Sequence, residues 1–357
     1  MDSVNDKTTG ESVLLDDLRL IAESPLQFDQ FRGATFLITG ATGLIGSLLV
    51  KTLLYCNRKK HLDLKILAVI RNRAKADSIF ATFLPDASLK YVICDLSSQE
   101  LKINFNVDYV IHTASVTASH EMISNPVGTI YTALHGTEKI LNLSVKAKVR
   151  AMVYLSSMEV YGSPCLNSKV TEKDLGYLDL TLPRSCYPES KRMCECLCSA
   201  YASQYGLNVK SARLAQTFGA GILPTENRVF AQFARSAMEG SNIVLHTAGR
   251  SEGNYVYTRD AVKAILMLLY SGKTGEAYNV ANEMSHTTIA EMAKMVANEI
   301  AGGRIKVIVD LPTNGTTYGY APDVKLYLSA DKMKRLGWEP EVCLKEAYVR
   351  MIRYLTY

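Results

Sequence analysis

The sequence lacks long hydrophobic runs and any strong excess of one charge. No apolar stretch approaches the roughly 20 residues that a membrane-spanning helix needs, so we expect no membrane segment. Residues 1–11 are polar and lack the apolar core of a signal peptide, which makes a cytoplasmic protein the expectation. The formal net charge is only +5, and no basic stripe interleaves with aromatic residues. Nucleic acid is therefore not an expected partner.

Cysteine is present, but its pattern matches no metal or disulfide framework. Eight cysteines in a chain without a secretion signal indicate reduced thiols. They cluster only at Cys194, Cys196 and Cys198, and on a helix the first and last of these share a face. The spacing fits no zinc-binding pattern, and no histidine lies near it in the sequence. We predict small buried side chains and no metal site.

The amino-acid composition is that of a globular protein. Hydrophobic residues make up 48% of the sequence and charged residues 21%, which excludes a disordered protein. A length of 357 residues suffices for one large core with a smaller lobe, or for two domains. The sequence shows no internal repeat and no low-complexity segment.

Segment 34–50 places a short apolar run before Gly40, Gly43 and Gly46, and a helical apolar pattern after them. This order predicts a buried strand, a tight turn and the start of a helix. Glycines in the turn let the backbone approach a pyrophosphate, and the helix N-terminus offers N–H groups and a positive dipole end. We interpret the segment as a dinucleotide-binding loop; the alternative is a purely structural strand-helix turn.

Strands and helices alternate from this loop onward. After the first strand, which starts at residue 34, strands are predicted at 65–70, 89–94, 107–112, 151–155 and 208–213, and helices at 124–146 and 188–205. Apolar strands separated by helices indicate parallel pairing with helices on both faces. We therefore predict an α/β fold, a Rossmann-type doubly wound parallel sheet.

The pattern loosens after Gly219. Helices are predicted at 226–239, 259–270 and 288–300, strands at 242–246, 277–280 and 305–309, and two short helices within 325–357. This half is expected to form a smaller C-terminal α/β substrate lobe that closes over the carboxyl ends of the strands.

The expected domain organisation has three parts. Residues 1–33 form an N-terminal extension, with a helix at 12–22. Residues 34–218 form the NAD(P)-binding domain, to which segments around 243–270 return, and residues 219–357 form mainly the substrate-binding lobe.

Three polar residues are expected to meet at the carboxyl ends of the strands. Ser157 directly follows the strand at 151–155, and Tyr187 and Lys191 lie four residues apart at a helix start, hence on one face. A lysine ammonium beside a phenol lowers the pKa of the phenol, which then exchanges a proton with a substrate hydroxyl near neutral pH. Beside a nicotinamide, such a trio suits hydride transfer at a secondary alcohol. The alternative for Tyr187 and Lys191 is a solvated helix face.

These motifs resemble those of the extended short-chain dehydrogenase/reductase family, in its NAD-dependent epimerase/dehydratase group that acts on nucleotide sugars. The resemblance runs from residue 34 to near the C-terminus and is closest to the branch of UDP-glucuronate decarboxylases and dTDP-glucose 4,6-dehydratases. The motifs that carry it are 40–46, 95–96, 112–115, 213–219, 257–262 and 336–340, together with Ser157, Tyr187 and Lys191.

The resemblance implies roles for individual residues. Tyr187 would be the catalytic base, Lys191 would support it and bind the nicotinamide ribose, and Ser157 would be the third member. Asp95 would contact the adenine side of the coenzyme. The other implied coenzyme-binding residues are Gly40, Thr42, Gly43, Leu44, Ile45, Gly46, Arg71, Leu96, Thr113, Ala114 and Ser115. The implied substrate-binding residues are Thr117, Gln216, Arg250 and Tyr257.

The implied reaction oxidises a sugar carbon, usually C4, to a ketone; elimination, decarboxylation or epimerisation follows, and the hydride usually returns. The 4,6-dehydratases carry an aspartic acid that protonates the leaving hydroxyl, and this chain has Met158 there, which disfavours ordinary 4,6-dehydration. Glu159 is retained, as in the decarboxylases. It is either an acid or base beside the ketone or the partner of Arg184 or Arg192, since ion pairs also use such carboxylates.

Substrate recognition departs from the family pattern. Many relatives carry an arginine that grips a phosphate two residues before Tyr255, where this chain has Gly253. Arg250 lies close in sequence and is the candidate substitute. Gln216 stands where the family has asparagine, so an amide is kept. The expected substrate remains a nucleotide sugar, with an unusual diphosphate contact or nucleotide.

The coenzyme is predicted from the strand at 65–70. An acidic residue after this strand would bind the adenosine ribose hydroxyls, but Arg71 and Arg73 follow it here. These arginines favour NADP if they hold a 2′-phosphate, whereas Arg71 stacked on adenine or simply solvated is compatible with NAD. The implied chemistry usually uses tightly held NAD, and NAD is our expectation, with NADP as the alternative.

Other functions are also compatible with the motifs. An NADPH-dependent carbonyl reductase of the same superfamily would use Arg71 and Arg73, and a 4,6-dehydratase would need a different acid. A non-catalytic dinucleotide-binding regulator would not need the trio. By resemblance we expect a homodimer, with Met193, Leu197 and Tyr201 as a candidate face, although packing within one chain explains these residues as well.

Overall fold

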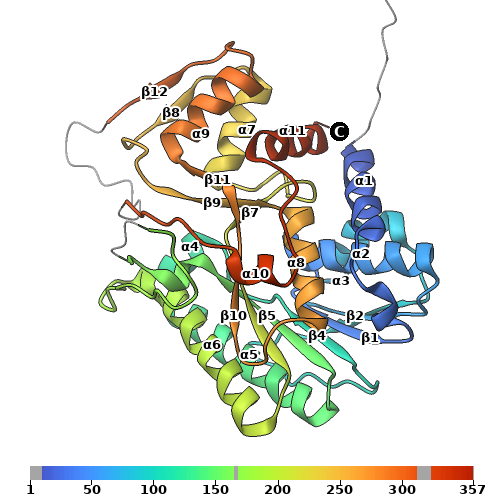
Figure 1. The fold of residues 1–357 in the computed structure, drawn as a ribbon. Helices are drawn as coiled ribbons and strands as arrows, with labels where there is room; N and C mark the ends of the chain where they lie inside the picture. The colour runs from blue at the N-terminus through green and yellow to red at the C-terminus, as the bar shows by residue number, and fades with distance from the viewer. Residues whose placement is uncertain (1–9, 165–167, 312–322, 357) are drawn as a thin grey trace, which may run out of the picture.

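Seven parallel strands form the main sheet of this computed structural model, which describes residues 10–164, 168–311 and 323–356 (Figure 1). Their spatial order is β10-β6-β5-β4-β1-β2-β3, with parallel pairing throughout. The strands are β1 (Thr35–Thr39), β2 (Lys65–Ile70), β3 (Leu89–Ile93), β4 (Tyr109–His112), β5 (Ala151–Ser157), β6 (Val209–Leu214) and β10 (Ala277–Val280). The order 3-2-1-4-5-6 is that of a doubly wound dinucleotide-binding sheet. The predicted fold class is confirmed.

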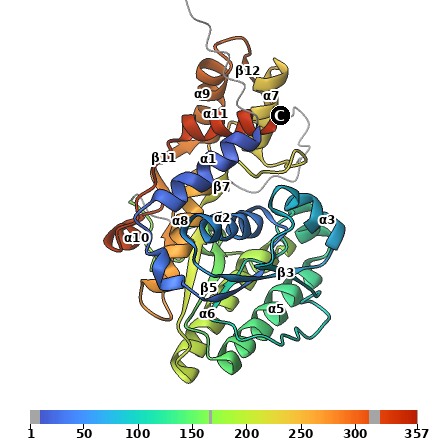
Figure 2. The same cartoon turned by 90° about the vertical axis from the view of Figure 1, so that its right-hand side faces the viewer.

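Helices cover both faces of this sheet. They are α2 (Leu44–Lys60), α3 (Arg73–Ile79), α5 (Pro126–Ala147), α6 (Cys186–Tyr205) and α8 (Thr258–Tyr270). Successive side chains of a strand point to opposite faces. Phe36 and Ile38 accordingly join a core with α2 and α8, and Leu37 joins a second core with α5 and α6. Figure 2 shows α2 on one side of the sheet and α5 and α6 on the other.

The second half of the chain forms most of a smaller lobe with its own core. Its elements are β7 (Gln216–Phe218), α7 (Val229–Glu239), β8 (Ile243–Leu245), β9 (Glu252–Tyr257), β11 (Asn282–Thr288), α9 (Ile289–Met295), β12 (Val307–Val309) and α11 (Leu344–Leu355). Strands β11, β9 and β7 make one sheet, and β12 and β8 make another. Phe218 stacks on Phe230 with ring centroids 4.7 Å apart at the centre of this core.

Two segments of the second half contact the main sheet. Helix α8 packs against β5 and β6, and β10 is an edge strand of the sheet beside the short helix α10 (Asp331–Arg335). Strand β8, in contrast, pairs with β12 in the smaller lobe. The division of the chain at residue 218 stays a prediction, and within 243–270 it is α8, not β8, that lies against the main sheet.

Some predicted helices differ from the observed ones for local reasons. The predicted helix 124–146 is observed as α5, and a short helix that was not predicted, α4 (Ser119–Ser124), precedes it. Pro126 at the first position of α5 has no N–H for a continuing helix, and the Asn125 side chain caps α5 by accepting the Gly128 N–H at 3.1 Å. The predicted helix 288–300 is α9 followed by a turn of π-helix at Val296–Ile300.

The N-terminal extension contains α1 (Gly10–Glu23), which includes the predicted helix 12–22. This helix contacts α2, α8 and α11, so it joins the helices on the main sheet to the last helix of the smaller lobe (Figure 2). Leu14, Leu18 and Ile21 on its inner side are buried in the main core. Among the described residues, no helix combines the length and the hydropathy that a bilayer crossing requires.

Candidate active site

The glycine loop between β1 and α2 leaves the start of a helix open to a ligand. Gly40 has a φ of +63°, a left-handed conformation that favours glycine. A Cβ atom at Gly46 would lie 2.2 Å from the Gly40 carbonyl oxygen, so α2 packs this closely on the turn because residue 46 is glycine. Gly43 is the N-cap of α2 and has no side chain that would cap the first N–H groups. The loop therefore offers backbone donors to an anion.

The end of β4 lies directly beside this loop. Thr113 follows β4, and its hydroxyl donates a hydrogen bond to the Thr39 carbonyl oxygen at 2.7 Å. The Ala114 N–H donates to the Thr39 hydroxyl at 3.2 Å. Ser115 is partly buried, and its hydroxyl donates to the Val116 carbonyl oxygen at 3.4 Å. Of the predicted coenzyme residues after β4, Thr113 and Ala114 thus lie against the start of the glycine loop.

Arg71 and Asp95 lie at the ends of the neighbouring strands β2 and β3. Asp95 accepts hydrogen bonds from the Ser97 hydroxyl at 2.7 Å and the Ser97 N–H at 3.0 Å. These bonds lower the pKa of Asp95, and the positive charges of Arg71 and Lys139 add to the effect. Arg71 is exposed, so both a carboxylate and a guanidinium are available at this edge.

The donor set fits a dinucleotide, because the open helix start suits a pyrophosphate and the Asp95 carboxylate suits an adenosine moiety.

The remaining predicted coenzyme-binding residues vary in exposure. Thr42, Leu44 and Ile45 are partly buried within the loop, and Leu96 is buried in the core between the sheet, α5 and α6. Arg73, the second arginine after β2, begins α3 and lies 3.7 Å from Asp77.

The predicted trio comes together where β5 ends and α6 begins. Ser157 is the last residue of β5, its hydroxyl accepts the Glu159 N–H at 3.2 Å, and the same side chain lowers the pKa of Tyr187. The Lys191 Nζ atom lies 5.7 Å from the centre of the Tyr187 ring and 4.8 Å from that of Tyr154. Lys191 also donates a hydrogen bond to the Leu155 carbonyl oxygen at 2.7 Å. The lysine is therefore held between two aromatic rings and the end of β5.

The pKa of Tyr187 is raised, whereas the sequence predicted a lowered value. Burial raises the pKa of Tyr187 to about 12, and the charge of Glu159 acts in the same direction. The Ser157 hydrogen bond and the charges of Arg184 and Arg228 oppose this rise. Burial also lowers the pKa of Lys191 to about 8, although nearby acidic groups raise it. Desolvation of the phenol thus outweighs the lowering of its pKa that the sequence predicted from the Lys191 ammonium.

Glu159 forms an ion pair at the edge of this trio. The Arg184 Nη2 atom donates to the two Glu159 carboxylate oxygens at 3.0 and 2.8 Å, and the Arg184 guanidinium lies 5.7 Å from the Tyr187 ring centre. Arg192, the other predicted partner, bonds to Glu189 instead. Each side chain of the Glu159–Arg184 pair is about one-third exposed, at 33% and 32%. An acidic and a basic group thus face solvent next to Tyr187.

The predicted substrate-binding residues differ in exposure. Thr117 and Arg250 are exposed, and Gln216 is partly buried in β7. Tyr257 is 1% exposed, and its hydroxyl donates to the Asp17 carboxylate at 2.6 Å. Because this hydroxyl is engaged with a buried carboxylate of α1, we correct the assignment of Tyr257 and do not retain it as a substrate-binding residue.

Arg228 is a charged residue of the site that the sequence did not reveal. It lies just before α7, pairs with Glu226 at 2.7 Å, and its charge lowers the pKa of Tyr187 against the effect of burial. No motif includes it, since its position depends on how the smaller lobe folds over β5 and α6. Met158, in contrast, packs against the main core as an apolar residue.

Comparisons with known proteins identify the family of the chain. A sequence model of the NAD dependent epimerase/dehydratase family matches residues 36–281. UDP-glucuronic acid decarboxylase 1 of Xenopus tropicalis is 30% identical over 250 residues, which cover 70% of this chain and 56% of that protein. UDP-glucuronic acid decarboxylase 6 of Arabidopsis thaliana is 29% identical over 327 residues, or 90% of each chain.

A solved structure shares the fold. The dTDP-glucose 4,6-dehydratase of Streptomyces venezuelae, crystallised with NAD bound, superimposes with a TM-score of 0.73 at 24% identity, covering 90% of this chain and 97% of that one. The aligned part of this chain spans little more than half of the Xenopus relative, at 56%. The family match, however, extends from β1 to the residue after β10. The chain therefore belongs to the NAD dependent epimerase/dehydratase family of enzymes.

Proposed function

We propose that this enzyme oxidises C4 of a nucleotide sugar to a ketone, decarboxylates or epimerises the keto sugar, and then returns the hydride. The observation that carries the proposal is the meeting of Ser157, Tyr187 and Lys191 at the carboxyl edge of the parallel sheet, the edge that also bears the glycine loop, with the Glu159–Arg184 pair at the edge of the trio. The relatives named as UDP-glucuronic acid decarboxylases support it.

Each residue of the trio has a distinct role in the proposal. Ser157 donates or accepts a hydrogen bond at the sugar hydroxyl, and Tyr187 takes the hydroxyl proton as that carbon is oxidised. Lys191, held at the Leu155 carbonyl oxygen, keeps a positive charge beside the phenol. NAD held by residues 40–46, Asp95 and Lys191 would supply the acceptor and donor of the hydride.

The groups next to Tyr187 favour an acidic sugar over ordinary 4,6-dehydration. Met158 cannot protonate a leaving hydroxyl and is packed against the core. Arg184 and Arg228 lie near Tyr187, each paired with a glutamate, Glu159 and Glu226, and in the proposal one of these arginines exchanges its glutamate for a substrate carboxylate next to the position of the ketone. A ketone destabilises such a carboxylate toward loss of CO2. Decarboxylation of a UDP-uronic acid is therefore our first choice, and 4-epimerisation is the second.

NAD is the proposed coenzyme, with NADP as the alternative. The family description and the NAD-bound dehydratase support NAD. The exposed Arg71 after β2 is the residue that supports NADP, because it could pair with a 2′-phosphate.

Identification of the released coenzyme and of the products tests the proposal. The protein is denatured in acid, the released nucleotide is identified by mass, and fresh enzyme is incubated with UDP-glucuronate, UDP-glucose, dTDP-glucose and GDP-mannose. Turnover of UDP-glucuronate, with CO2 or a 4-epimer as product and only catalytic coenzyme, supports the proposal. Stoichiometric consumption of NADPH on a carbonyl substrate would support the reductase instead.

We also propose a homodimer formed through α5 and α6. Val127, Tyr131 and Met193 on these helices are 61%, 55% and 52% exposed. Leu197 and Tyr201, in contrast, pack against the core of the same chain. Light scattering is expected to give twice the chain mass for the wild type and one chain mass for Tyr131→Glu. Val309→Glu, at a 54% exposed residue of β12, is the control that stays dimeric.

A further inference from the structure

We propose that Asp17, in the N-terminal helix α1, is a positioning residue for the loop 219–228 that leads from β7 to α7. Asp17 acts through Tyr257, and the inference rests on the proposed function insofar as this loop is taken to face the substrate. Helix α1 lies before the residues that match the family, which begin at residue 36. The inference therefore gives the extension a role that the family motifs do not describe.

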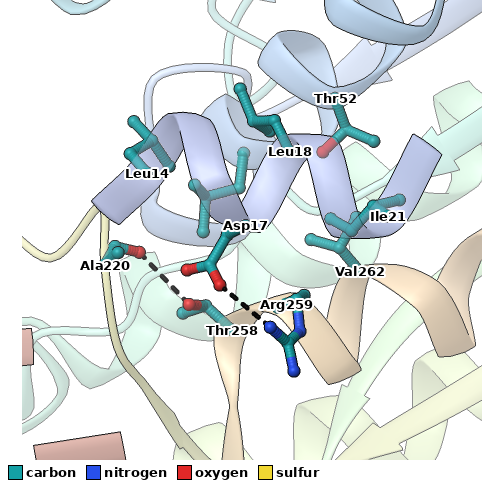
Figure 3. A pocket seen from close by; sticks show the side chains of 10 residues that line it. Leu14, Asp17, Leu18, Ile21, Thr52, Ala220, Thr258, Arg259 and Val262 are labelled. Carbon is teal, nitrogen blue, oxygen red and sulfur yellow. Dashed lines mark hydrogen bonds and ion pairs between the residues drawn. The ribbon is translucent and has the colours of Figure 1, made fainter. Parts of the chain in front are cut away.

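Asp17 is a buried carboxylate with partners from both parts of the molecule. Its side chain is 5% exposed and lies 2.7 Å from Arg350 of α11 and 3.4 Å from Arg259 of α8. The Asp17–Arg259 contact and the approach of α1 to the start of α8 are visible in Figure 3. Leu14 and Leu18 flank Asp17 and line a small cavity with Val262. The carboxylate is thus fixed by charge and by apolar packing.

Tyr257 links Asp17 to the loop 219–228. Its hydroxyl donates to Asp17 at 2.6 Å and accepts the Ala220 N–H at 3.4 Å. The Thr258 hydroxyl donates to the Ala220 carbonyl oxygen at 3.2 Å (Figure 3). A Cβ atom on Gly219 would lie 2.4 Å from the Tyr257 ring, so the backbone of the loop rests directly on that ring. Asp17, Tyr257 and Ala220 form one continuous chain of hydrogen bonds.

The loop leads to the site at its end. It follows β7, which carries Gln216, and it ends at Arg228, whose charge acts on Tyr187. Without the hydrogen bonds at Ala220, the start of the loop would be mobile, and Arg228 and the first turn of α7 would then occupy a wider range of positions. Asp17 therefore orders a substrate-side segment without touching the reacting atoms.

Hydrogen exchange of the full-length protein tests the placement of the loop. We expect Asp17→Ala and Tyr257→Phe to speed amide exchange in 216–228 about tenfold, because each breaks the chain of hydrogen bonds at one link. Asp16→Ala is the matched control, since Asp16 is the neighbouring acid on α1 and also contacts Arg350. It should leave exchange in 216–228 unchanged. Exchange that rises equally in α5 and α6, or not at all in 216–228, would overturn the inference.

Steady-state kinetics separate positioning from a general loss of stability. We expect both variants to raise KM for the nucleotide sugar about five- to tenfold with little change in kcat, and the double variant to add nothing further. A fall in kcat at unchanged KM contradicts the inference. If Asp17→Ala does not fold, Tyr257→Phe decides alone, because it keeps the ring under Gly219. If the wild type turns over no nucleotide sugar, the proposed function fails, while the exchange data still test the loop.

Discussion

At the scale of single residues, the chemistry centres on Tyr187 and the charges around it. Burial and Glu159 raise the pKa of the phenol, and Arg184 and Arg228 lower it. Because Glu159 and Arg184 also bind each other, removal of either one changes the net charge at the phenol by one unit. The two residues should therefore act in opposite directions on the proton transfer of Tyr187.

Replacement of Tyr187 by phenylalanine tests its role as the base. We expect kcat to fall about 10³-fold, the range of a lost general base, with the bound coenzyme retained. Single-turnover kinetics and the coenzyme content of the purified variant measure the two effects. Tyr177→Phe, at a tyrosine that is 73% exposed, is the control and should leave kcat unchanged. A Tyr187→Phe enzyme with wild-type turnover would refute the proposed mechanism.

Substitutions in the Glu159–Arg184 pair should shift the pH dependence of kcat in opposite directions. Arg184→Gln removes a charge that lowers the pKa of Tyr187, so the rising limb of kcat against pH should move to higher pH. Glu159→Gln removes a charge that raises this pKa, so the limb should move to lower pH. A shift of about 0.5 to 1 unit is expected, since both side chains are partly exposed. Shifts in the same direction for both variants would contradict the assignment.

At the scale of elements, the sequence predicted the large sheet well because most of its strands are buried on both faces. The apolar run of β2 coincides with the predicted segment 65–70, and β10 coincides with 277–280 although Asn279 interrupts it. The sheet of β7, β9 and β11 was missed, because β7 has only three residues and β9 contains Gly253 and Asn254. The trio depends on the large sheet and was found, whereas the burial of Tyr257 and the position of Arg228 depend on the smaller lobe.

Substitution of Gly46 tests how the start of α2 is placed. The added Cβ atom in Gly46→Ala would lie 2.2 Å from the Gly40 carbonyl oxygen, which forces α2 away from the turn. We expect coenzyme affinity to fall about tenfold or more and stability to fall by about 1–3 kcal/mol. Calorimetric titration with NAD and thermal unfolding measure these losses. Gly136→Ala in α5 is the control, because its added Cβ atom would lie 3.8 Å from the Leu96 Cβ atom, an ordinary van der Waals distance.

At the scale of the whole molecule, a buried histidine couples stability to pH. His112 ends β4 and is 2% exposed between the sheet and α5. Its ring nitrogens lie 2.6 Å from the Thr39 hydroxyl and 3.2 Å from the Thr137 hydroxyl. Burial lowers the pKa of His112 to about 3, and the nearby charge of Lys191 acts in the same direction. The folded protein thus keeps this imidazole neutral at a pH where the unfolded chain protonates it.

Acidification should therefore destabilise the fold through His112. Between the unfolded pKa of 6.5 and the folded pKa of about 3, the unfolded state binds one more proton, so stability falls as pH falls. The contribution approaches about 1.4 kcal/mol per pH unit below the unfolded pKa. Urea unfolding at pH 7, 6 and 5 measures it, and His112→Asn should flatten the pH dependence even if the variant is less stable at pH 7. His135→Asn, at an exposed histidine of α5, is the control that keeps the wild-type slope. An unchanged slope in His112→Asn would mean that other groups set the acid sensitivity of this fold.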